Sequence, residues 1–348
     1  MGGTKEQLLA RHADRVEAAI ASGQAAKSAL VASWRRSSRL HQLAPSGNRP
    51  PLRLTETELR LTIERIEPLI RAARSPMDRL YQALSAVGCC VLLAGCDGVP
   101  VNRRGAPADD AMFETWGLWT GTLWSEEHEG TNGIGTCLVE QRGLTIARDQ
   151  HFFTRNTLLS CTAVPIYDEQ ARLAGVLDVS SCRADITDEF ANLILLAAGE
   201  AARRIEADLF RCAFAKARIM LTPSTEAHGG GLLAIDGDDL VIGATRAARL
   251  VLGLPSDRAL RPVPAADLLC GLGAQEHLGD AQRAAVQRAL TRAQGNVSAA
   301  AKALGISRAT LHRKLKRFDL KRHSSAAGPS GECRSFATGC SRDFKPSG

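Results

Sequence analysis

The feature that most constrains this chain is a pair of short helical patterns around a tight turn, in residues 295–320. Asn296 is a favourable N-cap for the first helix, Gly305 ends it without steric cost, and Ser307 caps the second. Apolar residues recur at helical spacing in both segments. They are Val297, Ala300, Ala301 and Leu304 in the first helix, and Leu311, Leu315 and Phe318 in the second. The pattern predicts a helix-turn-helix.

Basic residues are concentrated around this motif. Residues 279–323 contain eleven Lys and Arg against two Asp, a net charge of +9, whereas the whole chain carries only +7. This distribution favours DNA binding over a solvated amphipathic hairpin. The residues expected to contact DNA are Ser307, Arg308, Thr310, His312, Arg313, Lys314, Lys316 and Arg317. The first two turns of the second helix, which we expect to meet base edges, carry Arg308, Thr310, His312 and Arg313. The residues expected to meet phosphates are Lys314, Lys316 and Arg317.

The composition is that of a globular chain with several domains. The 348 residues are 45% hydrophobic and 23% charged, and no apolar run approaches the roughly 20 residues that a membrane-spanning helix needs. The first residues, MGGTKEQLLARHADRVEAA, are charged and helical in pattern, unlike a signal peptide. We therefore expect a cytoplasmic, nucleoid-associated protein without membrane contact.

Ten cysteines are present, but their spacing is not that of a zinc site, because paired CxxC motifs are absent. We expect most of them to be small buried apolar residues. Cys89, Cys90 and Cys96 form the one local cluster, and a redox or metal role for it is the less favoured alternative. No metal or cofactor is predicted.

The amino-terminal half alternates between helical and strand patterns, which predicts an α+β multidomain protein. Residues 1–54 read as a helical segment, and residues 55–215 as a mixed α/β sensor domain with an antiparallel sheet and flanking helices. Thr55 and Glu58 have the spacing of a capping box. The expected strands are residues 89–94, 144–147, 162–167 and 173–180.

A long helix is expected to leave this domain, followed by smaller pieces. In residues 186–214 an apolar stripe is predicted, which suits either a dimer stem or packing on the domain's own sheet. Its members are Phe190, Leu193, Leu196, Ala197 and Ile205. The further segments are a strand–turn–strand–helix piece at residues 229–254, a linker at 255–279, the DNA-binding domain at 280–322 and a disordered tail at 323–348.

Several motifs in series resemble a known family. WSEEHEGTNGIGT at residues 124–136, CTAVPI at 161–166 and GVLDVS at 175–180 are similar to the GAF sensor domain of acetoin-catabolism-regulator-like bacterial activators. SWRRS at 33–37 and LAP at 43–45 resemble the segment that precedes that sensor. Residues 231–254 look like the PAS-like piece that follows it, and the helix-turn-helix is similar to the Fis-type module of that family. The resemblance implies a transcription regulator.

One part of that family's usual architecture is missing. Such regulators carry an AAA+ ATPase, which acts on sigma-54 polymerase, between the sensor and the helix-turn-helix. An ATPase of this kind needs a phosphate-binding loop, GxxxxGK[ST], whose Lys contacts the nucleotide. The chain has no Gly-Lys dipeptide, and residues 254–279 are far too few for such a domain. ATP-dependent activation of sigma-54 polymerase therefore does not carry over.

The sensor's candidate ligand residues come from the EHEGTNGIGT motif and its surroundings. Glycines at 130, 133 and 135 indicate a loop held tightly over the sheet. Asp178 is a polar residue in an apolar strand, where it faces solvent or a pocket or caps the next turn. The candidate ligand-binding residues are Trp119, Trp124, His128, Asn132 and Asp178. The alternative is that the motif only shapes the loop.

Catalysis is not expected from this sequence. The run Glu126, Glu127, His128, Glu129 invites a metal or acid–base interpretation, but four consecutive residues cannot all face one ion, which favours a solvated charged loop. No Ser-His-Asp or Cys-His arrangement in a family-specific context is found, so no catalytic residue is assigned. An enzyme built on the α/β domain has only this acidic run in its favour.

The sequence thus predicts a DNA-binding transcription regulator that senses an unidentified small molecule and acts as a homodimer on a two-fold site. Without an ATPase it represses by occlusion, contacts ordinary RNA polymerase, or competes with a longer relative. The alternative is a nucleoid-associated architectural protein with little sequence specificity.

Overall fold

The structure is a computed structural model, in which the described residues are 5–183, 187–223, 230–256, 259–269 and 278–320. The chain divides into two compact units, Met1–Leu269 and Cys270–Gly348. The tail predicted to be disordered, residues 323–348, lies outside the described residues.

The first unit is built around a five-stranded antiparallel sheet with strand order β2-β1-β5-β4-β3. Its strands are β1 (Cys89–Gly95), β2 (Pro100–Arg104), β3 (Leu144–Ala147), β4 (Ser160–Tyr167) and β5 (Leu173–Ser181). Four of them were expected from apolar runs. The edge strand β2 was missed because three of its five residues are Asn102, Arg103 and Arg104, a polar run that does not read as a strand.

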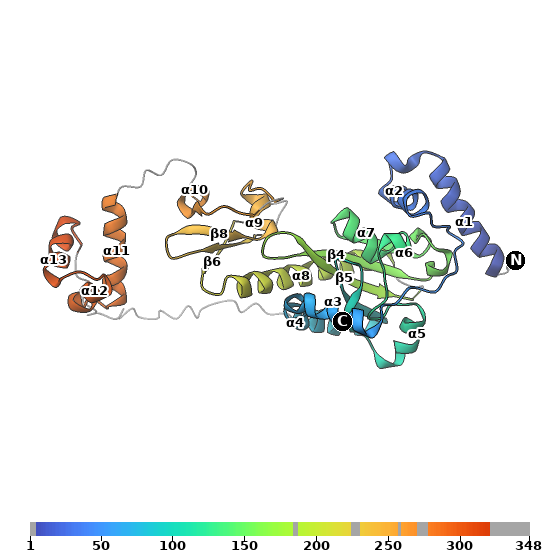
Figure 1. Cartoon of the computed structure of the whole chain (residues 1–348), viewed down its shortest axis with the longest axis horizontal. Helices are drawn as coiled ribbons and strands as arrows, with labels where there is room; N and C mark the ends of the chain where they lie inside the picture. Colours follow the sequence, from blue (N-terminus) through green and yellow to red (C-terminus); the bar gives the residue numbers. More distant parts are fainter. Residues whose placement is uncertain (1–4, 184–186, 224–229, 257–258, 270–277, 321–348) are drawn as a thin grey trace, which may run out of the picture. The chain divides into compact units, whose positions relative to one another are not determined.

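Alternation along the strands gives the sheet two buried faces. One face, carrying Val91, Leu93 and Leu177, is covered by α4 (Glu67–Leu84) and α8 (Asp188–Ala213). The other face, carrying Cys90, Leu92 and Val176, is covered by α7 (Gly133–Glu140) and α5 (Asp110–Thr115). Figure 1 shows this layered arrangement, with the short helix α6 (Glu126–Glu129) next to α7.

Two helical segments lead into the sheet. The capping box that starts α3 (Glu56–Arg65) is formed as predicted, because the Thr55 hydroxyl accepts from the Glu58 N–H and the Glu58 carboxylate accepts from the Thr55 N–H. Pro68 lies in the first turn of α4, where its missing N–H costs nothing, and so it marks a helix start.

The buried stripe of α8 differs from the prediction. Of the five residues expected there only Ile205 is buried, whereas Leu193 is 60% and Leu196 70% exposed. The buried side chains are Ala191, Ile194, Ala198, Ala201, Ala202, Ile205, Leu209 and Phe210. Four of these eight side chains are alanines, which allow α8 to pack closely against α4 and β4. Phe190 and Ala197 are half-buried against the same core, so the expected stripe departs from the observed one mainly at Leu193 and Leu196.

The amino-terminal segment is packed on the sensor domain. It comprises α1 (Lys5–Ala21), a 3-10 turn (Gln24–Ala26), α2 (Ala29–Arg35) and a π-helical turn (Arg36–Leu40). Val16, Val31 and Trp34 form an apolar cluster with Phe152 and Phe153, which lie between the 3-10 turns Arg148–Gln150 and Thr154–Asn156. The Trp34 indole N–H donates to the carbonyl of Gln150 at 2.8 Å. The segment is thus part of the domain's tertiary structure.

A second antiparallel sheet, of order β6-β7-β8-β9, follows α8. Its strands are β6 (Arg218–Leu221), β7 (Leu232–Ile235), β8 (Leu240–Ala244) and β9 (Val263–Pro264), with α9 (Arg246–Val251) and α10 (Ala265–Leu269). The sheet therefore extends on both sides of the segment 229–254, and β9 and α10 occupy part of the region expected to be a linker. Phe210 of α8 packs with Leu232 and Ala234 of β7, so the long helix contacts both sheets.

The second unit contains three described helices, α11 (Leu278–Arg292), α12 (Val297–Ala303) and α13 (Arg308–Arg317). Their shared core consists of Val286, Ala289, Leu290, Val297, Ala300, Ala301, Leu311 and Leu315. Leu304 is half-buried against this core, but Phe318 is not part of it and lies at the C-cap of α13. In the described part of the chain, no helix has the length and apolar character needed to cross a membrane.

Candidate DNA interface and sensor site

The helix-turn-helix has the local structure that its sequence dictates. The Asn296 side chain accepts from the Ala299 N–H at 3.1 Å and the Ser307 hydroxyl accepts from the Thr310 N–H at 3.1 Å, so each helix has its N-cap. Gly305, between the helices, has a φ of 65°, a left-handed conformation that favours glycine. Caps and turn together fix where α12 ends and α13 begins.

The predicted DNA-contacting residues lie on α13 and at its N-cap. Leu311 and Leu315 turn inward, whereas Ser307, Arg308, Arg313, Lys316 and Arg317 are exposed. Thr310, His312 and Lys314 are half-buried. A helix with one buried apolar face and a basic outer face is suited to entry into the major groove.

Two of these side chains also make contacts within the unit. The Lys314 ammonium donates to Oε1 of Gln282 at 2.8 Å, which ties α13 to α11. The Arg313 guanidinium lies 3.3 Å from the Thr310 hydroxyl, one turn earlier on the same helix. Which of the eight residues meet bases and which meet phosphates stays a prediction.

In the sensor, the SWRRS and EHEGTNGIGT segments meet in a buried polar junction. Arg36 makes a bidentate pair with Glu126, from Nε to Oε2 at 2.9 Å and from Nη2 to Oε1 at 3.0 Å. The Ser33 hydroxyl donates to Glu126 Oε1 at 2.5 Å and lies 2.7 Å from the Thr131 hydroxyl. The hydrogen bonds from Arg36 to Glu126 raise the pKa of Arg36 above its usual value. The two motifs are therefore parts of one structural unit.

Arg36 also ties in the helix that follows the motif. Its Nη2 donates to Glu140, the last residue of α7, at 2.8 Å. One guanidinium thus bridges α6 and α7, and a buried carboxylate that would otherwise be costly is compensated.

The expected solvated loop at residues 126–129 is wrong, because these residues form the short helix α6 and two of the four are buried. Glu126 is 3% and Glu129 2% exposed. Glu129 binds Nη2 of Arg155 through both carboxylate oxygens, at 2.7 and 2.6 Å, and accepts from Asn156 at 3.3 Å. Burial raises the pKa of Glu129, although the Arg155 charge acts in the opposite direction. Distant arginines make this burial tolerable, and they cannot be identified from the four residues alone.

The glycines of the motif hold a loop tightly over the sheet, as predicted. A Cβ on Gly133 would lie 2.7 Å from Cβ of Cys161 and 2.8 Å from Oδ1 of Asp178. The Asn132 side chain caps α7 by accepting from Gly135 N–H at 2.8 Å, and its amide donates to the Gly130 carbonyl at 2.8 Å. Asn132 therefore serves the loop, and a ligand contact for it stays a prediction.

Asp178 points into the sealed interior under α7. Its side chain is 1% exposed, Ser180 donates to Oδ2 at 2.6 Å, and Oδ1 has no hydrogen-bond partner among the described residues. Burial raises the pKa of Asp178 to about 7, and the Ser180 hydrogen bond only partly offsets this effect. A carboxyl in this state can donate or accept a proton near neutral pH.

The structure does not bring all predicted ligand residues together. Trp124 is in the core beside α7, and its indole N–H donates to the Gly117 carbonyl at 2.8 Å. Trp119 lies against the guanidinium of Arg103, 4.4 Å from carbon to ring centroid. His128 instead lines a surface pocket of about 480 Å³ that also includes Leu43 of the LAP motif. Asp178 and His128 therefore lie at different sites, Asp178 in the buried interior and His128 at this surface pocket.

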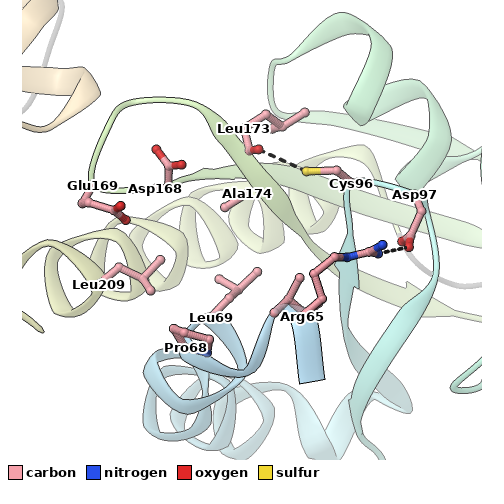
Figure 2. Close-up of a pocket in the computed structure, with 11 residues that line it drawn as sticks. Arg65, Pro68, Leu69, Cys96, Asp97, Asp168, Glu169, Leu173, Ala174 and Leu209 are labelled. Carbon is pink, nitrogen blue, oxygen red and sulfur yellow. Dashed lines mark hydrogen bonds and ion pairs between the residues drawn. The ribbon is translucent and has the colours of Figure 1, made fainter. Parts of the chain in front are cut away.

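A further pocket, of about 520 Å³, opens beside the β1–β2 and β4–β5 turns, at one end of the strands (Figure 2). Leu69, Ala174 and Leu209 give it an apolar lining, and Arg65 pairs with Asp97 at 2.6 Å on its rim. Cys96 is exposed here and donates to the Leu173 carbonyl at 3.1 Å. None of the predicted ligand residues lines this pocket.

The cysteine cluster predicted from sequence is dispersed by strand geometry. Cys89 and Cys90 lie at the start of β1 and contribute to opposite faces of the sheet, whereas Cys96 follows its end. Burial raises the pKa of Cys89 to about 11, so it stays a thiol at neutral pH. Within the described part of the chain, no group of three His, Cys, Asp or Glu side chains is arranged to hold a metal.

A sensor with an antiparallel sheet and helices on both faces, followed by a helix-turn-helix, defines a class of bacterial transcription regulators. Residues 4–207 match the family model of the MimR N-terminal domain, and the chain belongs to this family. Residues 278–318 match the model described as "Bacterial regulatory protein, Fis family". The resemblance to acetoin-catabolism regulators is thereby confirmed.

Individual relatives agree with this family. The acetoin catabolism regulatory protein of Cupriavidus necator is 31% identical over 239 residues, covering 67% of this chain and 36% of the relative. The propane 2-monooxygenase operon transcriptional activator MimR of Mycolicibacterium smegmatis is 30% identical over 220 residues, covering 62% and 36%. The chain thus spans about a third of the length of these relatives.

Among solved structures, the E. coli DhaR(N)–DhaL complex contains a chain that matches with a TM-score of 0.49 at 16% identity, covering 75% of this chain and 86% of that one.

Between the two matched family regions lie only residues 208–277. Their described part holds the end of α8 and the second sheet with its two short helices, and the sequence has no phosphate-binding loop.

Proposed function

We propose that this chain is a sequence-specific DNA-binding transcription regulator whose amino-terminal domain senses a small molecule. The observation that carries the proposal is the exposed basic surface of α13 on a fully capped helix-turn-helix. Membership of the MimR N-terminal family and the names of the relatives support it. DNA binding implies that the protein works in the cytoplasm, at the nucleoid.

The way it acts on transcription follows from what lies between the two matched regions. Residues 208–277 are far too few for an AAA+ ATPase and lack its phosphate-binding lysine motif. We infer that the chain does not drive sigma-54 polymerase with ATP, and instead occludes a promoter, contacts ordinary RNA polymerase, or competes with a longer relative.

A homodimer is part of the proposal, because one helix-turn-helix contacts only one half-site. Leu193 and Leu196 support it, since they are three residues apart on α8 and exposed, which gives this helix an apolar strip outside its own core. The sequence left two roles open for α8, a dimer stem and packing on its own sheet. The two roles are compatible, because different faces of the helix are available for them.

The experiment that tests the function compares binding to the protein's own promoter region and to random DNA at matched salt. A regulator should prefer the specific site by about 10³-fold or more. Equal affinities for both DNAs, with the same salt dependence, would favour the alternative of an architectural protein. A screen of metabolites for compounds that change DNA affinity tests the sensing half.

A further inference from the structure

Arg103 lies on the face of the sensor sheet that α5 and α7 cover, where a guanidinium is unusual. It is opposite Leu92 in the β1–β2 register, and Leu92 is in turn opposite Asp178 of β5. Its side chain is only 10% exposed. The guanidinium lies 4.4 Å from the ring centroid of Trp119 and 5.4 Å from that of Phe113. A cation is therefore held between aromatic rings at the edge of the core.

The hydrogen bonds of Arg103 are incomplete. Nη1 donates to Oδ1 of Asp110 at 2.7 Å. Nε and Nη2 are both buried and have no hydrogen-bond partner among the described residues. In the described part of the chain, Arg103 is the one side chain with two such atoms. Leaving buried charged donors without an acceptor is costly, so a fold that retains them has a reason to do so.

The two unpartnered donors have a definite chemical preference. Nε–H and Nη2–H point the same way from the planar guanidinium and form a fork that matches the two oxygens of a carboxylate. Arg36 uses this same pair of nitrogens to bind Glu126 at 2.9 and 3.0 Å. Arg103 presents that fork without a protein carboxylate to fill it.

The surroundings narrow the class of ligand further. Asp110 already offsets part of the Arg103 charge, which favours a singly charged carboxylate over a doubly charged phosphate. Trp119, Phe113 and Leu92 supply apolar and aromatic surface beside the fork. Asp178, two strands away and hence about 10 Å from Arg103 across the sheet, has its own unpartnered oxygen on the same face.

We propose that Arg103 binds the carboxylate of a small carboxylic acid with an apolar or aromatic body, and that this acid is the signal that the sensor detects. The proposal rests on the sensing function proposed above, and it adds a residue and a ligand class to it. Trp119 is then the stacking partner that holds the guanidinium in place.

The test measures the melting temperature and the dissociation constant of the full chain with acetate, butyrate and benzoate, each compared with its uncharged amide. We expect at least one acid to stabilise the protein while its amide does not. Arg103→Gln should weaken binding of that acid about tenfold or more, because two charge-assisted hydrogen bonds are lost. Arg103→Lys keeps the positive charge but lacks the forked pair of donors, so it should also weaken binding of the acid.

Arg104→Gln is the matched control, because Arg104 is the next residue of β2 and binds Asp78 of α4 on the opposite face. It should leave the affinity unchanged. If Arg103→Gln does not fold, Arg103→Lys decides the question. Unchanged binding in the folded Arg103 variant, equal binding of acid and amide, or stabilisation by none of the three acids would overturn the proposal. In the last case a neutral metabolite that changes DNA affinity would leave the sensing function standing, whereas no response to any metabolite would remove both.

Discussion

The helix-turn-helix and the sensor domain handle polar residues in opposite ways. In the helix-turn-helix the basic side chains of α13 lie outside a small apolar core, where they are available to DNA. In the sensor, charged groups such as Glu126, Glu129 and Asp178 lie inside, and most of them are neutralised by partners from distant segments. Substitutions should therefore change binding in the first region and stability in the second.

The largest effect is expected at the buried junction of the sensor. Arg36→Ala leaves the Glu126 carboxylate buried without its cation, and should lower the free energy of unfolding by about 3–5 kcal/mol. Arg35→Ala, at the neighbouring exposed position, is the control and should change it by less than about 0.5 kcal/mol. Urea denaturation of both variants gives the comparison. Equal stability of the two would mean that the junction does not hold the sensor together.

A pair of glycines tests how tightly the α7 loop is packed. Gly133→Ala places a Cβ within 2.8 Å of Cys161 and Asp178, and should destabilise the sensor by about 1–3 kcal/mol. Gly199→Ala, in the middle of α8 with no neighbouring atom closer than 3.9 Å, should stabilise it by about 0.5–1 kcal/mol. Thermal melts of the two variants should shift in opposite directions; shifts in the same direction would contradict the packing argument.

In the helix-turn-helix, substitutions of the basic residues should change DNA binding and leave stability almost unchanged. Arg308→Ala should cost about 1–3 kcal/mol of binding at the preferred DNA site and relax sequence choice, while stability changes by less than about 0.5 kcal/mol. Lys316→Ala should weaken binding to all sequences alike and lower the salt dependence. Binding titrations on specific and random DNA distinguish the two, and equal loss on both DNAs for Arg308→Ala would assign that residue to phosphates.

The last effect concerns pH. The pKa of Asp178 is raised by burial to about 7 from an ordinary value near 4, so the folded state binds more protons than the unfolded state between these values. Stability from this group is therefore present at low pH and is lost as pH rises towards 7, by at most about 1.4 kcal/mol per pH unit. Asp178→Asn should remove this loss, as measured by urea denaturation at several pH values. The same slope in wild type and variant would show that Asp178 does not titrate in this range.

Local structure was predictable where neighbours in sequence decide it. The caps at Thr55, Asn296 and Ser307 each involve residues three positions apart, and all three are formed. The strands with largely apolar runs were found for the same reason, since burial on both faces leaves few polar residues in the pattern. The β1–β2 turn likewise depends on two neighbouring residues, Asp97 and Gly98, and Gly98 has a φ of 78°.

Predictions failed where burial depends on a distant partner. Glu126 looks like a solvent-exposed acid until Arg36, 90 positions earlier, is placed beside it. The apolar stripe of α8 was assigned partly to exposed positions, Leu193 and Leu196, because alanines, which form half of the buried stripe, carry a weak hydrophobic signal. Arg103 gave no signal at all, since only the register of β2 on β1 turns it inward.

By itself, then, the sequence determined the helix-turn-helix, four of the five strands of the sensor sheet and the family, because these depend on short-range spacing and on motifs. Only the tertiary structure decided which charges are buried, which face of α8 packs, and which polar groups keep unpartnered donors. The physical reason is that the cost of a buried charge is set by its partners across the fold, and those lie far away in sequence.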